Sequence, residues 1–229
     1  MELDHPSKHF KDLSQKFQSD WDSKNKGPSP TVEAIMQIVN PALAQRLEDY
    51  RKTLPQRYQR IESYYHGTKL NCKGTVQYFL QCKDPKCGAC GILQDGFVKR
   101  CINTSKFMRY GPGFYLACNS SKANDYVGGC STYRAILLCD VAPGRKNEVR
   151  ENACNITGPP EGYHSVYGKK KTWFRSGVLN YDEIVLYDSN ALCPRYIFFY
   201  RPLLVRTYWS MLCMCVLWVC NCKPSIERH

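Results

Sequence analysis

Apolar residues gather in three short runs in the second half of the chain. The runs occupy residues 135–139, 183–187 and 196–200, and the stretches between them are rich in Gly, Asn, Asp and Pro. Short apolar runs that are bounded by turn-forming residues are typical of β-strands. We therefore predict a mainly β core from about residue 60 onward, within an α+β fold.

Residues 31–52 have the pattern of two successive helices. The first carries its apolar residues between positions 35 and 39, and Asn40-Pro41 interrupts it. Because Asn suits the N-cap position and Pro suits the first helical turn, a second helix is predicted to begin there. Its apolar residues recur at a spacing near 3.6 and give it one apolar face: Leu43, Leu47 and Tyr50.

The two ends of the chain differ from this central part, which leaves residues 31–202 as the predicted domain. Residues 1–30 are polar, with five Lys against five Asp and Glu, and end in the breaker sequence Lys-Gly-Pro-Ser-Pro, so we predict a flexible polar tail. Residues 203–229 form a hydrophobic tail rich in Cys and Trp, in which the sixteen residues 207–222 are uncharged. Such a segment would span roughly 24 Å as a helix, whereas a hydrocarbon core is about 30 Å thick. A packed tail or an artefact of the gene model is therefore preferred to a membrane anchor, and all three interpretations stay open.

The composition narrows the class of protein. The 229-residue chain has a net charge of +12, fourteen cysteines and 43% hydrophobic residues. This composition suits a globular core and argues against a disordered chain. A basic surface favours anionic partners such as nucleic acid. Because the N-terminus has no apolar stretch of the kind found in secretory signals, we expect an intracellular protein, in the nucleus or the cytoplasm, whose cysteines are reduced.

Four cysteines lie close together within a cysteine-rich insertion at about residues 72–101. They are Cys72, Cys82, Cys87 and Cys90, and the last three read Cys-x4-Cys-x2-Cys. This spacing fits a four-cysteine zinc site, in which the thiolates surround one tetrahedral metal at about 2.3 Å. Such a zinc ion would be structural, because the protein supplies all four ligands. The alternative is a group of buried free thiols.

Three segments combine glycine or a strand end with residues that could do chemistry. In His66-Gly67-Thr68 the glycine lets the backbone approach a ligand closely. Residues 111–115 contain two glycines and a proline before an apolar run, and could hold Tyr115 against a flat ligand. Tyr181-Asp182-Glu183 puts carboxylates at the head of another apolar run. Taken singly, each segment also has a plain structural interpretation as a hydrogen-bonded histidine, a hairpin loop or a solvated strand end.

Taken in this order, the three segments resemble the catalytic core of the poly(ADP-ribose) polymerase family. The resemblance rests on His-Gly-Thr at 66–68, Gly-x-Gly-Phe-Tyr-Leu-Ala at 111–117 with Ser-Ser-Lys-Ala-Asn-Asp-Tyr at 120–126, and Tyr-Asp-Glu-Ile-Val-Leu-Tyr-Asp at 181–188. It covers about residues 32–202. It implies the ADP-ribosyltransferase fold, with split, mainly antiparallel sheets and short helices around an NAD cleft. It also implies a glycosyltransferase that transfers ADP-ribose from NAD to an acceptor and releases nicotinamide.

The family's His-Tyr-Glu triad corresponds, by this resemblance, to His66, Tyr115 and Glu183. His66 would bind the adenosine ribose, and Tyr115 and Tyr126 would stack on the nicotinamide ring. Glu183 would accept a hydrogen bond from the nicotinamide ribose and stabilise the transition state. Ala123 stands where the family carries the serine that binds the carboxamide, which departs from the pattern. The remaining residues implied to bind NAD are Gly67, Thr68 and either Ser121 or Ser120.

The acceptor and the extent of transfer stay open at this point. Protein side chains, the chain itself and nucleic acid are all acceptable, and Glu183 is compatible with either single-unit or polymer transfer. An inactive NAD pocket that binds ADP-ribose or a protein partner is one alternative. The other is a zinc-stabilised module that binds nucleic acid through Lys169-Lys170-Lys171, beside Trp173 and Phe174.

Overall fold

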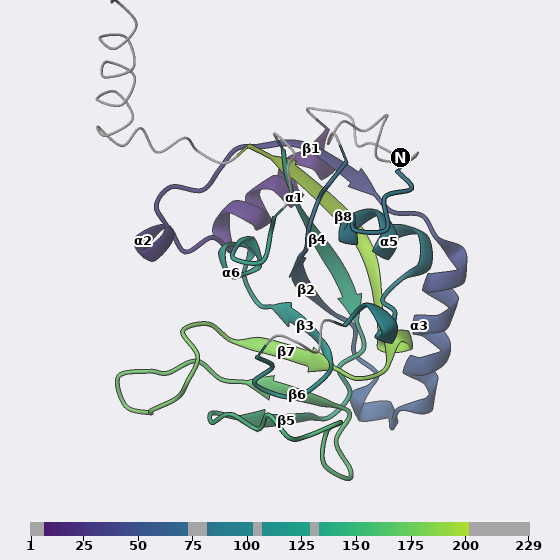
Figure 1. Ribbon diagram of the computed structural model, residues 1–229, viewed down its shortest axis with the longest axis vertical. Helices are drawn as coiled ribbons and strands as arrows, with labels where there is room; N and C mark the ends of the chain where they lie inside the picture. Colours follow the sequence, from purple (N-terminus) through teal and green to yellow (C-terminus); the bar gives the residue numbers. More distant parts are fainter. Residues whose placement is uncertain (1–6, 73–81, 103–106, 129–132, 202–229) are drawn as a thin grey trace, which may run out of the picture.

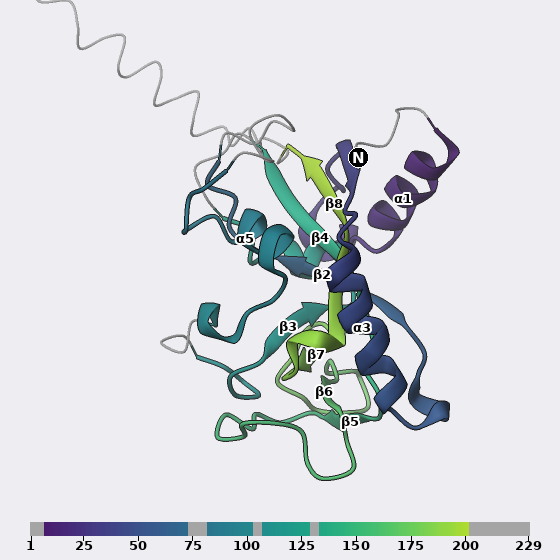
Figure 2. The same cartoon turned by 90° about the vertical axis from the view of Figure 1, so that its right-hand side faces the viewer.

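The computed structural model describes residues 7–72, 82–102, 107–128 and 133–201 (Figure 1, Figure 2). They form one mixed sheet with short helices around it. The strands are β1 (Val32–Gln37), β2 (Glu62–Gly67), β3 (Phe114–Ala117), β4 (Arg134–Val141), β5 (Lys146–Val149), β6 (Ser165–Gly168), β7 (Glu183–Leu186) and β8 (Leu192–Tyr200). The helices are α1 (Lys8–Ser19), α2 (Ser23–Lys26), α3 (Pro41–Thr53), α5 (Gly88–Asp95) and α6 (Ser120–Asn124), with short 3-10 turns η1 (Gln56–Tyr58), η2 (Lys99–Cys101) and η3 (Ser189–Ala191).

The eight strands follow the order β1-β8-β4-β2-β3-β7-β6-β5, and all described pairs are antiparallel except β5 with β6. The sheet is nearly divided in the middle, because β2 and β3 share a single described pair, Tyr65 with Ala117. Figure 2 shows the two halves one above the other, with β2 and β3 meeting between them. This arrangement confirms the predicted α+β fold with a split, mainly antiparallel sheet.

The predicted apolar runs form the centre of this sheet. Residues 135–139 lie in β4, residues 196–200 lie in β8, and β7 begins at Glu183. Strand β8 pairs with both β1 and β4 within the sheet, and separate hydrophobic clusters cover its two faces. Ile197 and Phe198 are therefore completely buried, on opposite faces of the strand.

The prediction of a flexible tail over residues 1–30 is wrong for helix α1. The side chain of Ser7 caps this helix by accepting a hydrogen bond from the backbone of Phe10 at 3.2 Å. Phe10, Leu13 and Phe17 are buried against the sheet, and the Phe17 ring stacks on Phe198 with centroids 5.3 Å apart. Burial of each such side chain stabilises the fold by about 1.5–3 kcal/mol. The N-terminal segment is therefore part of the domain.

The prediction of a helix over residues 31–39 is also wrong, because Val32–Gln37 forms the edge strand β1. Pairing with β8 satisfies the backbone hydrogen-bonding groups on one side of β1, and a helix could not pair with β8 in this way. The second predicted helix is confirmed as α3. Asn40 caps it by accepting a hydrogen bond from the backbone of Leu43 at 3.2 Å, and Pro41 is its first residue.

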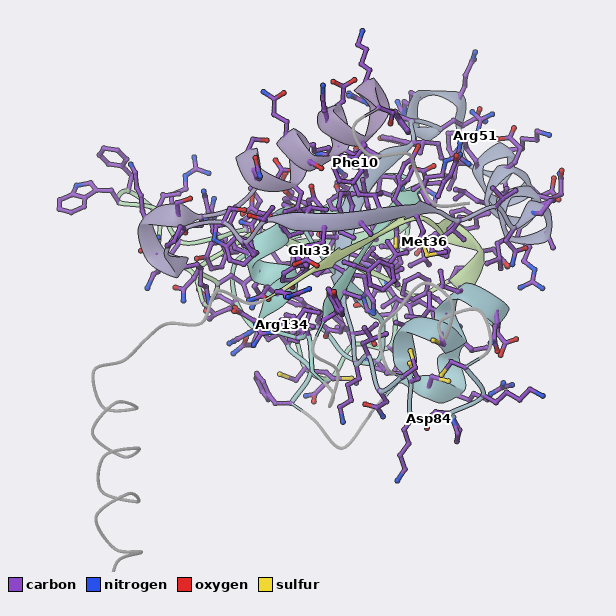
Figure 3. All side chains as sticks on the ribbon, turned by 90° about the horizontal axis from the view of Figure 1, so that it is seen from above. Phe10, Glu33, Met36, Arg51, Asp84 and Arg134 are labelled. Atoms are coloured by element: carbon purple, nitrogen blue, oxygen red, sulfur yellow. The ribbon has the colours of Figure 1, made fainter. Side chains whose placement is uncertain are left out.

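Helix α1 and the cysteine-rich segment lie on opposite faces of the sheet. In Figure 3, Phe10 marks the helix on one side and Asp84 marks the cysteine-rich segment on the other. Among the described residues, no helix is long and apolar enough to cross a membrane. The predicted hydrophobic tail at 203–229 lies outside the described residues, as do residues 1–6.

Candidate active site

A cleft lies where the two halves of the sheet meet. Its walls come from β2, β3, the first residue of β7 and the end of α6. The fold thus brings together the three residues of the predicted triad, which are far apart in the sequence. The lining residues are Tyr65, His66, Gly67, Tyr115, Leu116, Ala117, Ala123, Tyr126 and Glu183.

His66 is held in one tautomer. Its Nδ1 lies 2.9 Å from the carbonyl oxygen of Tyr115, and a carbonyl only accepts, so Nδ1 carries the proton. Burial lowers the pKa of His66, against a smaller raising effect of this hydrogen bond, and keeps the ring neutral at neutral pH. A neutral ring protonated at Nδ1 has a lone pair at Nε2. That nitrogen can accept a hydrogen bond from a ligand hydroxyl.

The glycine-rich loop is built around Tyr115. The Tyr115 hydroxyl donates to the carbonyl of Gly111 and accepts from the N–H of Tyr110, both at 2.9 Å. Gly111 has a φ of 67°, and a Cβ there would lie 1.7 Å from the carbonyl oxygen of Ile156. A side chain at this position is therefore excluded twice, by conformation and by space. The loop holds the Tyr115 ring in the wall of the cleft by its own hydrogen bonds.

Gly67 allows helix α6 to approach strand β2. A Cβ at Gly67 would lie 1.8 Å from the carbonyl oxygen of Ala123 and 3.3 Å from Cβ of Tyr126. Because nothing but hydrogen fits there, α6 can bring Ala123 and Tyr126 into the cleft. Tyr126 is 54% exposed, and the ammonium of Lys122 lies over its ring at 4.8 Å from the centroid. One aromatic surface is thus presented at the mouth of the cleft.

Glu183 is a buried carboxylate at the head of strand β7. It pairs with Ala117 across β3 and β7 and is 4% exposed. Burial raises its pKa, and the positive charges of Lys122 and Arg109 partly oppose this effect. Within the described part of the chain, no group donates a hydrogen bond to the carboxylate. A ligand hydroxyl in the cleft would supply the hydrogen bond that a buried carboxylate requires.

The structure does not bring the predicted serines into the cleft. Ser120 and Ser121 are completely buried. The Ser120 hydroxyl donates to the carbonyl of Phe17 at 2.7 Å, and the Ser121 hydroxyl accepts from the N–H of Asp22 at 3.2 Å. Ala123 lines the cleft instead, at the position where the family pattern calls for a serine.

Thr68, which the resemblance implies to bind NAD, and the histidine His164 both lie outside the lining of the cleft. Thr68 packs against the start of α5, where a Cβ at Gly88 would lie 2.3 Å from its Oγ1. His164 accepts a hydrogen bond from the N–H of Arg145 at 3.0 Å, beside the ring of Tyr58.

Sequence reasoning missed the N-terminal residues that border the site. The Tyr181 hydroxyl donates to Asp22 at 2.8 Å, and Lys26 forms an ion pair of 2.7 Å with Asp125. These contacts join the segment after α1 to both α6 and the head of β7. No local pattern indicates pairs that lie so far apart in the sequence.

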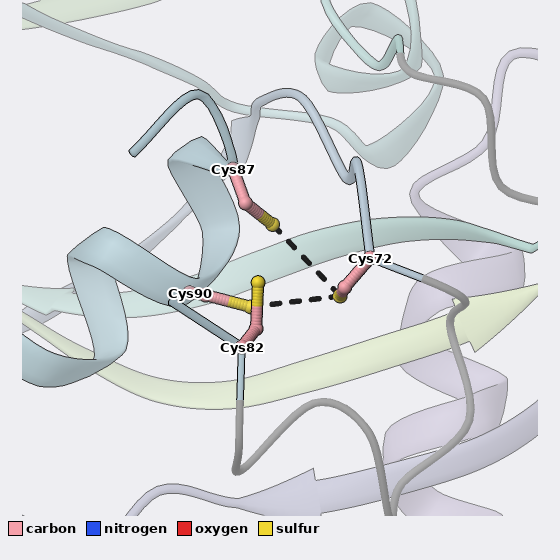
Figure 4. A group of neighbouring side chains, drawn as sticks. All are labelled: Cys72, Cys82, Cys87 and Cys90. Carbon is pink, nitrogen blue, oxygen red and sulfur yellow. Dashed lines mark hydrogen bonds between the residues drawn. The ribbon is translucent and has the colours of Figure 1, made fainter. Parts of the chain in front are cut away.

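The four cysteines of the insertion converge on one point (Figure 4). The Sγ atoms of Cys72, Cys82, Cys87 and Cys90 all lie within 4.8 Å of one another. Cys72 lies 3.6 Å from Cys90 and 3.9 Å from Cys87. A tetrahedral metal with metal–sulfur bonds of about 2.3 Å would place its sulfurs about 3.8 Å apart. The donor set therefore fits one soft metal ion such as zinc.

Residues 7–202 match the family described as the poly(ADP-ribose) polymerase catalytic domain. The chain belongs to this family. The match begins at the N-cap of α1, in agreement with the packing of that helix on the sheet. Membership of the poly(ADP-ribose) polymerase family implies NAD as the substrate.

Several poly(ADP-ribose) polymerase relatives have named functions. The chain is 33% identical over 89 residues to human protein mono-ADP-ribosyltransferase PARP4. This match covers 38% of this chain and 5% of the relative. It is 27% identical over 173 residues to a probable poly(ADP-ribose) polymerase of Dictyostelium discoideum, covering 69% of this chain and 46% of the relative. The mouse PARP4 protein is 28% identical over 115 residues. The chain thus spans less than half the length of these relatives.

Proposed function

We propose that this chain is an active NAD-dependent ADP-ribosyltransferase. It would cleave the bond between nicotinamide and ribose, transfer ADP-ribose to an acceptor and release nicotinamide. The observation that carries the proposal is the buried Glu183 carboxylate, which lies in the same cleft as His66 and Tyr115 and accepts no hydrogen bond from the residues that the structure describes. An inactive pocket would have no need for a buried ionisable group, because such a group is unfavourable without a ligand.

Residues on the two sides of the cleft would bind NAD. His66, neutral and protonated at Nδ1, would accept a hydrogen bond from an adenosine-ribose hydroxyl at Nε2. Tyr115 and the exposed ring of Tyr126 would stack on the nicotinamide, each pair contributing about 0.5–1.5 kcal/mol beyond area burial. The backbone of Gly67 would bind the carboxamide without the serine that the family pattern calls for.

Catalysis falls to Glu183. Its carboxylate would accept a hydrogen bond from the nicotinamide ribose and stabilise the positive charge that develops as the glycosidic bond breaks. Such an interaction strengthens in the transition state, so it accelerates the reaction rather than only binding the substrate. Lys122 and Arg109 help to keep the carboxylate ionised in its buried position.

The acceptor is proposed to be protein, with the chain itself as one target, inside the nucleus or cytoplasm. Human PARP4 is named a mono-ADP-ribosyltransferase and the Dictyostelium relative a probable polymerase, so single-unit and polymer products both need to be resolved. The test is incubation of the purified full chain with NAD labelled on the adenine. We expect nicotinamide release and protein-bound label, both lost in Glu183→Ala. Absence of release from a folded wild-type chain would contradict the proposal, and gel mobility of the labelled product separates one unit from a polymer.

We further propose that the four cysteines hold one structural zinc ion. The support is the spacing of their sulfur atoms and the absence of any other ligand type among them. Elemental analysis of the purified full chain should find about one zinc per chain. Cys90→Ser should lose the metal, whereas Cys101→Ser, at an exposed cysteine outside the group, should retain it. If wild-type protein that was purified under reducing conditions contains no metal, the assignment is contradicted.

Nucleic-acid binding is a second candidate function. It is favoured by a hairpin that precedes β7 in the sequence. Thr172 and Arg175 pair across its turn, and the two rings at the tip, Trp173 and Phe174, are 94% and 91% exposed. Lys169-Lys170-Lys171 precedes them, and exposed rings beside basic side chains suit stacking on single-stranded bases. A labelled single-stranded oligonucleotide should bind with an affinity that falls with salt and with Trp173→Ala. Equal binding by wild type and variant would rule this candidate out.

A further inference from the structure

We infer that Phe97 positions His66, and that the four-cysteine site holds Phe97 in place through helix α5. Metal binding at the cysteines is thereby coupled to NAD binding in the cleft. The inference rests on the proposed function, because it concerns the affinity of the same cleft for NAD. It adds a positioning residue and a requirement for metal, neither of which belongs to the motifs of the cleft.

His66 is held from two directions. Its Nδ1 donates to the carbonyl of Tyr115 at 2.9 Å. The second contact is an edge-to-face contact with Phe97, whose ring centroid lies 5.0 Å from that of His66 at an interplanar angle of 81°. Phe97 is 5% exposed and also packs edge-on against Phe114, with centroids 5.6 Å apart. The hydrogen bond fixes one nitrogen of the imidazole, and the Phe97 ring packs against the imidazole itself and restricts its movement.

Phe97 owes its place to helix α5. The helix has eight residues and ends at Asp95, and its C-cap Gly96, with a φ of 77°, turns the chain into Phe97. A helix this short is not stable by itself in water, so contacts with the rest of the fold must fix its position. Within α5 only Ala89 and Cys90 are buried, and both lie in its first turn. The N-terminal end is therefore the anchored end.

Two of the four cysteines lie at that anchored end. Cys87 is the N-cap of α5, and Cys90 lies in its first turn. Cys72 follows strand β2, which carries the histidine of the cleft. A metal bound to these thiolates would tie the start of α5 to the segment that leaves β2. One backbone hydrogen bond joins the same two segments, from the N–H of Ala89 to the carbonyl of Lys69 at 3.1 Å.

Without metal, the contacts of these sulfur atoms with one another are weak. The Cys72–Cys90 and Cys87–Cys72 separations of 3.6 and 3.9 Å correspond to weak thiol hydrogen bonds, and two thiolates would repel each other. Loss of the metal would leave the start of α5 held only by burial and by hydrogen bonds such as those of Asn71 to Cys87 and Lys86, at 3.4 and 3.2 Å, and would so loosen it. Phe97, at the other end, would then lose its fixed position against His66.

The coupling predicts a specific kinetic pattern in the full chain. Removal of the metal should raise the KM for NAD about tenfold and change kcat much less, because His66 orients NAD rather than acting on the breaking bond. Phe97→Ala should have the same effect with the metal retained. Phe97→Leu, which keeps apolar bulk, should restore most of the affinity. In the metal-free protein Phe97→Ala should add nothing further, because the two changes act through one contact.

A second readout does not depend on activity. The imidazole resonances of His66 can be assigned in an NMR spectrum by their loss in His66→Gln. We expect metal removal and Phe97→Ala to shift or broaden these resonances in the same way. Cys101→Ser, at an exposed cysteine outside the site, is the matched control and should leave the metal content, the KM and the spectrum unchanged.

The outcomes separate the two proposals. An unchanged KM and an unchanged His66 resonance in the metal-free folded chain, or in Phe97→Ala, would overturn the inference. If no wild-type chain releases nicotinamide but the His66 resonance moves on metal removal, the proposed function fails and the positional coupling stands. Should Cys90→Ser fail to fold, Phe97→Ala still decides, because it leaves all four cysteines intact.

Discussion

Substitution of Gly67 by alanine should damage the cleft far more than the size of one methyl group suggests. The new Cβ would lie 1.8 Å from the carbonyl oxygen of Ala123, whereas real Cβ contacts below 3.0 Å essentially never occur. Strand β2 and helix α6 must therefore separate by about 1.2 Å, the difference between these two distances. Overpacking of this kind costs about 1–3 kcal/mol of stability. A shift of about 1 Å in Tyr126 can reduce catalytic efficiency about 100-fold.

The assay compares Gly67→Ala with Gly91→Ala, which adds a methyl group at a helical glycine with nothing within 4 Å. We expect a lower midpoint of thermal unfolding and about 100-fold lower kcat/KM for nicotinamide release in the first variant. The second should be as active as wild type and up to about 1 kcal/mol more stable, because alanine favours a helix over glycine. A folded Gly67→Ala chain with kcat/KM close to wild type would refute the role of this close approach.

Three other substitutions test separate parts of the account. Phe17→Ala should lower the free energy of unfolding, measured in urea, by about 3–5 kcal/mol, because it removes the ring that packs α1 against the sheet. A loss below about 1 kcal/mol would mean that α1 is dispensable for the stability of the fold. Tyr115→Phe should cost about 1–3 kcal/mol in the same measurement, since it removes the partner of both Tyr110 and Gly111. Burial raises the pKa of Glu183, so kcat should fall as pH drops through a value above the usual carboxylate range. Catalysis needs the ionised form of Glu183, whereas burial disfavours that form. The free energy of unfolding is therefore expected to fall as pH rises through the same raised pKa. Glu183→Gln should therefore be at least as stable as wild type near neutral pH, and a clear destabilisation would argue against this balance.

The sheet could be predicted where burial on both faces leaves a continuous apolar run, as in β4 and β8. Helix α1 was missed because charged residues surround its three buried positions, although Phe10, Leu13 and Phe17 recur at helical spacing. The apolar residues of Val32–Gln37 do not alternate strictly, so the local pattern predicts a helix where the structure has a strand. Only pairing with β8, which lies at the far end of the sequence, decides between the two structures.

The residues of the cleft were predictable to the extent that each stands in a local motif. His66, Tyr115 and Glu183 follow from three such motifs, and the fold places all three in one cleft. The contact of Phe97 with His66 has no such signal, because a phenylalanine after a helix is unremarkable in sequence. The hydrogen bond that Ser121 accepts from the backbone of Asp22 likewise joins two residues that no sequence pattern connects.

The most direct test of the central claim is a comparison of wild type with Glu183→Gln in two measurements on the same protein. One is the affinity for NAD by calorimetry, and the other is the rate of nicotinamide release. We predict an affinity within a few-fold of wild type and a release rate lower by about 100-fold or more, because glutamine can bind the ribose hydroxyl but carries no charge for the transition state. Equal release rates in the two proteins would contradict the assignment of Glu183 as the catalytic residue.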